Sequence, residues 1–509
     1  MNDVLGEKTH RTIYIVLLAL LGGTMVTSVW AANLVWVLLL ANWVLEGRWR
    51  EKWQMARESR LQQAWVALYA LLMLGMAWTQ NTGHGLDVLR VKLPMLVVPV
   101  VMLTTRPLEG QARRTVLWLY AATVFAVSLI GLARMLTIAD LPYRDAVPFI
   151  SHIRFALNCC MVIYICMGAI IRLRSRWRWL ALPVALWMLV FIVMLHSYTA
   201  LAVLAVVSLA TLLVHYRRWW LVWTWAAVAV AAATVLACEV RSYYRMIPMA
   251  TEPRIGFTAN GNPYDHAEDG IIENGNYVDN YVCKKELHEQ WERRSAIPYH
   301  GLTESGYSVE STLIRYLNGM GLTKDSAGVA ALTDVQIAAV ERGVANPVYE
   351  SGNVVKKMVY VMLLEREFYV HTRAVAGFTM LQRFELWRTT LDIVKDNPVV
   401  GVGTGDVDDE LHSRLDNMDS ELSGTTKRSH NQYLSLMAAI GILGFAIVLV
   451  MFVRAAVGKG RSLSPLMLAW LLTILISCLT EDTLDTLAGI LFCTYFLCFR
   501  HQQCTNTTH

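Results

Sequence analysis

The stretch NQYLSLMAAIGILGFAIVLVMFV, Asn431–Val453, decides the fold class because its 23 residues are mostly apolar and none of them is charged. About 20 apolar residues in a helix are enough to cross the hydrocarbon core of a bilayer. The whole chain of 509 residues is also poor in charge, with 17% charged and 55% hydrophobic residues, whereas soluble domains have about 25% charged residues. The sequence therefore predicts an integral membrane protein.

Similar apolar runs recur along the chain, separated by short polar segments, and we count about twelve candidate spans. Leu93–Thr104 is the shortest and could be re-entrant rather than spanning. Tryptophans such as Trp30 and Trp219 lie at the ends of runs, as is typical of side chains at the headgroup level. The runs are Thr12–Val29, Ala31–Leu45, Ala64–Trp78, Leu93–Thr104, Thr115–Met135, Phe155–Ile171, Trp179–His196, Tyr198–His215, Trp219–Cys238, Asn431–Val453, Pro465–Leu479 and Leu484–Phe499.

The polar segments between the runs alternate in their content of lysine and arginine. With a cytoplasmic N-terminus, the inside segments hold about 20 of these residues and the short outside segments about five, in agreement with the positive-inside rule. Both termini are then cytoplasmic. The prediction is an all-α polytopic membrane protein in which an outside domain (239–430) separates an N-terminal membrane domain (1–238, about nine spans) from C-terminal helices (431–509, about three spans). The outside domain thus lies between helices nine and ten.

The outside region is too long to be a loop without structure of its own. Apolar spacing of three and four residues predicts helices over Ser308–Met320 and Asp334–Val344, with Thr333 or Asp334 as the N-cap of the second. Longer helices are expected over Val354–Arg373 and Phe378–Lys395, whereas Ile255–Asn280 is rich in turn-forming residues. The outside domain is therefore expected to be mainly helical.

Several features argue against other classes of protein. The spans hold almost no ionisable residues, which a coupled transporter usually needs. The first outside turn, Val29–Asn33, has no carboxylate to hold a metal, and no phosphate-binding loop or zinc motif is present. The nine cysteines have no metal-ligand spacing, although Cys238 and Cys283 could form a disulfide if their region faces an oxidising compartment. No metal, cofactor or nucleic-acid partner is expected.

The residues with chemical potential cluster late in the chain. Arg383, Trp387 and Arg388 lie on an expected helix, and the turn that follows is rich in glycine, at Gly401, Gly403 and Gly405. His430 then stands at the entry to the span that holds Gly441 and Gly444, followed by Asn431, Tyr433 and Leu434. Glycines allow close approach to the backbone, a histidine can take a proton near neutral pH, and an arginine can grip a diphosphate with two donors. Taken singly, each also has a structural interpretation, as a turn, a helix cap or a solvated charge.

Taken together, this order of residues resembles the O-antigen ligase and polymerase family. The resemblance implies a bacterial inner-membrane enzyme that moves a glycan from an undecaprenyl-diphosphate carrier to an acceptor hydroxyl at the periplasmic face, with inversion and without a metal. In a ligase the acceptor is lipid A–core. In a polymerase it is a second carrier-linked glycan. A lipid-linked glycan transporter or a structural partner in an envelope assembly are the alternatives from other classes.

Within the resemblance, His430 matches the catalytic base and Arg383 matches a diphosphate-binding arginine. The family often has a second arginine in a Ser-Arg motif, but Ser197 is followed here by Tyr198, so we expect Arg154 at the mouth of another helix to supply that charge. The other substrate-binding candidates are Arg388, Asn431, Gly401, Gly403 and Tyr198. Blocks around Glu273–Tyr277, Arg315 and Lys324-Asp325 look like insertions of a subgroup, and the sequence does not reveal their role.

Overall fold

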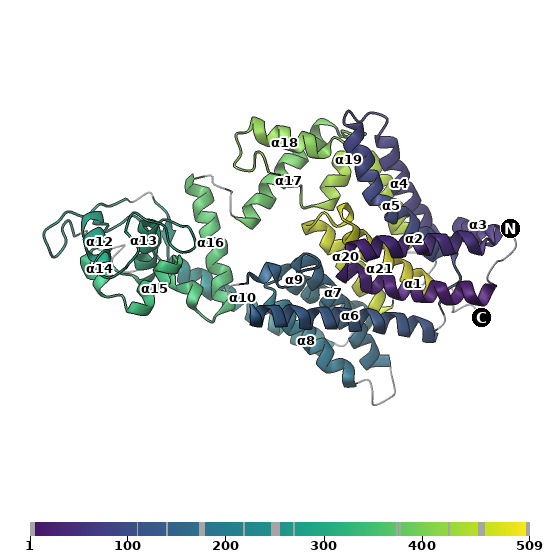
Figure 1. The fold of residues 1–509 in the computed structure, drawn as a ribbon, viewed down its shortest axis with the longest axis horizontal. Coiled ribbons are helices and arrows are strands. Elements are labelled where there is room, and N and C mark those ends of the chain that lie inside the picture. Colours follow the sequence, from purple (N-terminus) through teal and green to yellow (C-terminus); the bar gives the residue numbers. More distant parts are fainter. Residues whose placement is uncertain are drawn as a thin grey trace. The chain divides into compact units, whose positions relative to one another are not determined.

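The computed structural model describes residues 6–108, 110–138, 141–172, 179–216, 219–245, 255–267, 270–372, 375, 378–425, 428–456 and 464–504. These residues are predominantly helical, and the strands among them form one two-stranded sheet (Figure 1). The chain divides into two compact units, one made of Met1–Val222 and Leu386–His509, the other of Trp223–Glu385. The all-α class is confirmed.

The first unit contains most of the apolar helices, and each of the twelve apolar runs lies wholly or largely within a helix. Among the described residues, seven helices are long and apolar enough to cross a membrane, and three shorter apolar helices accompany them. The protein is thus a multi-pass membrane protein, while twelve spans, the cytoplasmic termini and the outside location of 239–430 remain predictions. The helices of this unit are α1 (Glu7–Thr27), α2 (Val29–Glu46), α3 (Trp49–Glu58), α4 (Arg60–Gly75), α5 (Thr82–Thr104), α6 (Gly110–Thr137), α7 (His152–Arg172), α8 (Ala181–Met194), α9 (Tyr198–Thr211), α18 (Val407–Asn417), α19 (Gln432–Ala456), α20 (Pro465–Thr480) and α21 (Leu487–Cys504). The boundary between the units falls within α10 (Trp219–Tyr244) and within α17 (Thr379–Asp396).

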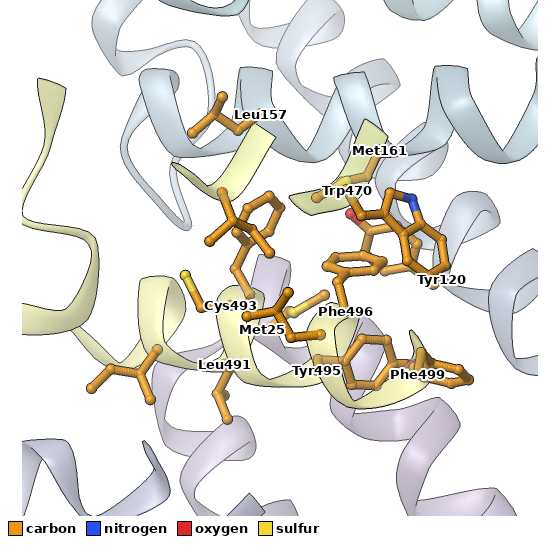
Figure 2. Packing of buried hydrophobic residues seen from close by; sticks show 14 of the residues in the cluster. Met25, Tyr120, Leu157, Met161, Trp470, Leu491, Cys493, Tyr495, Phe496 and Phe499 are labelled. Carbon is orange, nitrogen blue, oxygen red and sulfur yellow. The ribbon is translucent and has the colours of Figure 1, made fainter. Parts of the chain in front are cut away.

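Aromatic side chains from helices far apart in the sequence meet in the core of the first unit (Figure 2). The ring of Phe496 on α21 lies 5.2 Å from that of Tyr120 on α6 and 5.1 Å from that of Trp470 on α20, measured between ring centres. All three side chains are at most 1% exposed. Edge-on and tilted aromatic pairs of this kind add to the stabilisation from buried area, so α21 acts as a central packing element.

The run Leu93–Thr104, which the sequence leaves open as re-entrant, is the second half of the continuous helix α5. Asn81 caps that helix by accepting a hydrogen bond from the backbone N–H of His84. The first half is polar, and it carries Lys92, which is buried and forms an ion pair with Asp485. The hydropathy pattern misses the first half because it is polar, and its buried lysine, Lys92, is paired with a carboxylate that is distant in sequence.

The second unit contains a small helical lobe with its own apolar core, which includes Trp291, Tyr299, Leu313 and Leu317. A hairpin of β1 (Ile272–Glu273) and β2 (Asn276–Tyr277) lies within the region expected to consist of loops and turns. The predicted helices are confirmed, and Thr333 forms a capping box with Gln336 at the start of α15. The helices of this unit are α12 (Lys284–Trp291), α13 (Val309–Met320), α14 (Ser326–Ala330), α15 (Asp334–Arg342) and α16 (Val354–Thr372).

A buried carboxylate organises the insertion blocks within the second unit. Glu273 is 0% exposed, accepts a hydrogen bond from Arg315 Nε at 3.0 Å and one from Asn346 Nδ2 at 2.7 Å, and also contacts the hydroxyl of Tyr360 on α16. A buried charge needs such partners to offset its desolvation. Glu273 of the β1–β2 hairpin thereby connects the hairpin to α13 and α16. Cys238 and Cys283 are both free thiols, so no disulfide links them.

Candidate functional site

Helix α19 is broken at Gly441, which has φ 71° and ψ 170°. The glycine-rich turn fills the break, because Val402 N–H donates to the carbonyl of Ala438 at 2.8 Å and Ile442 N–H donates to that of Pro398 at 2.8 Å. A Cβ on Gly401 would lie 2.3 Å from the carbonyl oxygen of Ala438. The group that approaches the backbone of this turn is thus another backbone. Substrate binding by Gly401 and Gly403 remains a prediction.

The same turn is also fixed to the connection between α4 and α5. Thr404 Oγ1 donates to the carbonyl of Leu72 at 2.6 Å, and the carboxylate of Asp406 accepts from the backbone N–H groups of Gln80 and Asn81, both at 2.8 Å. A Cβ on Gly403 would meet Thr79 Oγ1 at 2.5 Å. Residues 398–406 therefore form a rigid platform between α4, α5 and α19.

His430 has the left-handed backbone conformation, with φ 50°, which is uncommon for a residue other than glycine. Two contacts hold it there. Its N–H donates to Asp482 Oδ2 at 2.7 Å, and its carbonyl accepts from Trp387 Nε1 at 3.3 Å. Strained residues of this kind persist when their surroundings hold them, and they are frequent at functional sites. Trp387 on α17 and His430, which lie 43 positions apart in the chain, are thus in contact in the folded protein.

The imidazole of His430 faces a carboxylate. Its Nδ1 lies 3.8 Å from Glu481 Oε2, and its side chain is 36% exposed, whereas the side chain of Glu481 is 11% exposed. Nδ1 itself is buried. The two groups form an ion pair only when the imidazole carries a proton.

Asp482 joins the two segments that form the site. Its Oδ1 accepts from Ser429 Oγ at 3.0 Å and from Ser435 Oγ at 2.9 Å, while Oδ2 binds the N–H of His430. Burial raises the pKa of Asp482, and the nearby charge of Asp485 adds to that shift. The connection between α20 and α21 is thus tied to the start of α19.

Arg154, at the start of α7, belongs to the same electrostatic neighbourhood. Its guanidinium interacts electrostatically with Glu481, Asp482, Asp485 and Arg428. Its Nε is buried and has no hydrogen-bond partner among the described residues. A buried donor without a partner costs free energy, so a ligand that accepts a hydrogen bond from this atom would relieve the cost.

A hollow with an empty volume of about 790 Å³ lies beside these residues. Arg428 and Ser429 line it, together with Lys92 from α5 and Asp408 from α18. Arg428 connects two other residues of the lining. Its Nε lies 3.3 Å from Asp408 Oδ2, and its Nη1 donates to the carbonyl of Asp485 at 3.3 Å. The hollow therefore combines cations with carboxylates, and Ser429, the residue before His430 in the chain, forms part of its lining.

The structure separates the predicted site residues into groups. His430 and Arg154 share one charged neighbourhood in the first unit, whereas Arg383 belongs to the second unit, since the boundary falls within α17 after Glu385. Asn431 caps α19, because its Oδ1 accepts from the N–H groups of Tyr433 and Leu434. Arg388 is exposed, and Tyr198 begins α9 with 42% of its surface exposed. No observation tests the predicted roles of these residues.

Sequence reasoning missed Glu481, Asp482, Lys92 and Arg428. The available signal for the carboxylates was Glu481-Asp482 in the short gap between two apolar runs and Asp485 at the start of the second run. Lys92 and Arg428 carried no local signal, because their role depends on segments that meet only in the folded chain. In the described part of the chain, no group of three or more His, Cys, Asp or Glu side chains is placed to hold a metal ion. Metal independence stays a prediction.

The comparisons with known proteins agree with this arrangement. Residues 343–449 match the family model described as O-antigen ligase. The match includes α17, the glycine-rich turn, His430 and the break at Gly441. No curated protein matches the chain. The match confirms the predicted resemblance, and over residues 343–449 the chain is similar to the O-antigen ligase and polymerase superfamily.

Proposed function

We propose that the protein is an O-antigen ligase-like glycan transferase, which moves a glycan from an undecaprenyl-diphosphate carrier to an acceptor hydroxyl at the periplasmic face of the bacterial inner membrane. The observation that supports this proposal most directly is the geometry of His430. Its backbone is held by Trp387 and Asp482, and its ring lies beside Glu481. This arrangement falls within the segment that matches the ligase family, apart from the two carboxylates.

The proposed reaction is a single displacement. His430 takes the proton of the acceptor hydroxyl, and the acceptor oxygen forms a bond to the anomeric carbon of the glycan. The bond from that carbon to the diphosphate oxygen breaks, the carrier diphosphate leaves with the electron pair, and the configuration inverts. Glu481 stabilises the imidazolium, and Arg154 with its buried Nε offsets charge on the leaving diphosphate.

Arg383 is the second proposed diphosphate ligand. Arg383 precedes Trp387 by four positions on the continuous helix α17, so the two are about one helical turn apart. Arg383→Lys keeps a positive charge but loses the planar fork. Transfer should fall in this variant, and unchanged transfer would make Arg383 a structural residue.

The acceptor is lipid A–core in the ligase proposal, and a carrier-linked glycan in the polymerase alternative. Both reactions share the donor and the base, so the residues described above are compatible with either. A lipid-linked glycan transporter would carry out no bond formation at all. The distinction therefore requires the products to be identified.

The decisive experiment supplies the purified protein in proteoliposomes with carrier-linked glycan, either with lipid A–core or with no second acceptor. Glycan on lipid A–core supports the ligase, and longer carrier-linked chains support the polymerase. His430→Ala should abolish either product, whereas His300→Ala, a surface histidine of the other unit, should have no effect. Normal transfer by His430→Ala would remove the proposed base, and no new bond with wild-type protein would favour the transporter.

A further inference from the structure

A second charged hollow lies where three segments of the first unit meet: the start of α1, the end of α2 and residues 105–107 after α5. Its empty volume is about 1390 Å³. Four cationic side chains line it against two carboxylates, and the six residues are Lys8, Arg11, Arg48, Arg106, Glu7 and Glu46. Glu51 on α3 also accepts from Arg48 Nε at 3.2 Å and lies 3.6 Å from Arg106 Nη2, so four cationic side chains face three carboxylates. The proposed transfer reaction does not use this remaining positive charge.

Two of the arginines converge on one point. Arg48 Nη1 lies 2.8 Å and Arg106 Nη1 lies 2.6 Å from the same oxygen, Glu7 Oε1. The backbone supports this geometry, since Arg48 has a left-handed φ of 55° and Arg11 donates to the carbonyls of Arg106 and Pro107. Two guanidinium groups are thus already arranged to hold one anionic oxygen.

The carboxylate of Glu7, which these two arginines bind, is held only weakly. The side chain of Glu7 is 57% exposed, and exposed ion pairs contribute little stability. Glu46 is engaged elsewhere, with Lys52 Nζ at 2.9 Å from its Oε2. Lys8 forms no ion pair among the described residues. An incoming anion can therefore replace Glu7 and gain the additional charge of Lys8.

Aromatic side chains indicate the depth of the hollow in the bilayer. Trp43 lines it and donates from Nε1 to Thr104 Oγ1 at 2.8 Å. Trp49, at the start of α3, packs edge-on against Trp43 with ring centres 5.2 Å apart, and both Trp49 and Trp53 are more than half exposed. Tryptophan favours the headgroup level, and α3 combines it with Arg50 and Arg57, so we expect the hollow to open among lipid headgroups.

We propose that this hollow binds the phosphate group of an anionic phospholipid, with Lys8, Arg48 and Arg106 as its contacts. The planar guanidinium matches phosphate oxygens, and basic residues near a membrane surface attract anionic lipids. The apolar parts of α1 and α2 begin beside the hollow, so the acyl chains of the same lipid can remain in the bilayer. The inference goes beyond the proposed transfer reaction and does not depend on it.

The test uses the full-length protein, purified in an uncharged detergent and delipidated, with bound lipid counted by native mass spectrometry. Phosphatidylglycerol is compared with phosphatidylcholine of the same acyl chains, and inorganic phosphate is tested as a competitor. We expect a preference for phosphatidylglycerol that K8Q/R106Q weakens about tenfold or more. R50Q/R57Q removes two charges from α3 outside the hollow and should keep the preference.

Three results would overturn the proposal. They are equal binding of the two lipids, unchanged phosphatidylglycerol binding by K8Q/R106Q, and complete displacement of the lipid by an equal concentration of inorganic phosphate, which would identify a site for a soluble anion. Size-exclusion profiles establish that each variant is folded. If K8Q/R106Q does not fold, R106K is tested instead. It keeps the positive charge but lacks the planar guanidinium with its paired donors, so it should bind phosphatidylglycerol more weakly than wild type does.

Discussion

At the scale of single residues, the position of His430 is determined more by its backbone than by its ring. The N–H group binds Asp482 and the carbonyl binds Trp387, so both peptide groups are fixed while the imidazole stays about one-third exposed. This combination suits a base that must meet a substrate in a reproducible orientation. The adjoining carboxylate, Glu481, is therefore the informative residue to change.

Glu481→Gln should lower transfer roughly tenfold or more, because the amide cannot stabilise an imidazolium as a carboxylate does. The protein level should not change, since the substitution keeps the shape of the side chain. Initial rates in proteoliposomes measure the effect. Glu289→Gln, an exposed glutamate on α12, serves as the control. A wild-type rate in Glu481→Gln would mean that His430 acts without this carboxylate.

Lys324 provides a pH-dependent contribution to stability in the second unit. Burial lowers its pKa to about 7, although Asp279 and Glu273 act in the opposite direction. Its Nζ contacts the carbonyl of Asn280 at 3.0 Å and Asn318 Oδ1 at 2.8 Å. Below pH 7 the lysine is protonated in both states, and the folded lobe bears the full cost of the buried charge. Between pH 7 and 10.5 the unfolded chain binds more protons than the folded lobe.

Stability therefore rises with pH in that window. The temperature at which the lobe becomes susceptible to protease should rise from pH 7 to pH 10 more steeply in the wild type than in Lys324→Met, which has no proton to lose. Parallel curves for the two proteins would show that Lys324 remains charged when folded. The comparison is made between variants because other groups titrate over the same range.

At the scale of elements, the interrupted helix α19 determines how the site is built. The break at Gly441 leaves backbone groups that the turn at residues 398–403 satisfies. A side chain at this position meets two obstacles, because φ is 71° and a Cβ would lie 2.1 Å from the carbonyl oxygen of Val399. Glycine is thus required at the kink for both conformation and space.

Gly441→Ala should destabilise the first unit by about 2–5 kcal/mol and reduce the folded yield, as measured by size-exclusion chromatography in detergent. Gly168→Ala on α7 is the matched control, since its Cβ would have no neighbour nearer than 4.0 Å. If Gly441→Ala were as stable and active as Gly168→Ala, α19 would have to adopt another path than the one described.

The elements were predictable from sequence to different degrees. Periodicity and capping residues predicted α13 and α15, since Thr333 and Gln336 act within one helical turn. The polar half of α5 was not predicted, because Lys92 is compatible with burial only through Asp485, nearly 400 residues away (|i−j| = 393). Within the site, the order of motifs identified His430, but the carboxylates around it depend on tertiary contacts that no local pattern encodes.

At the scale of the whole molecule, the division into compact units differs from the division by compartment. Residues 386–425 and 428–430 are expected outside the membrane, yet they belong to the first unit, together with most of the membrane helices. The compartment of each segment is a separate property, which the contacts do not reveal. Labelling with an impermeant thiol reagent measures it directly.

In a Cys238→Ser, Cys504→Ser background, Ser305→Cys should react with such a reagent in cells whose outer membrane has been permeabilised. Arg57→Cys should react only after the inner membrane is opened, because α3 lies in a predicted cytoplasmic segment. Labelling of Arg57→Cys from outside would reverse the predicted topology. Labelling of neither position before opening would place the lobe in the cytoplasm.

The union of the glycine-rich turn with the broken helix also has a consequence for biogenesis. Residues 398–403 precede Gly441 by only about forty positions in the chain, so the ribosome delivers the turn shortly before the helix that needs it. Until the two meet, α19 would present unpaired peptide groups within the hydrocarbon, which is costly. We therefore expect the turn to satisfy these peptide groups as α19 inserts, so that the insertion of α19 and the formation of the site occur together.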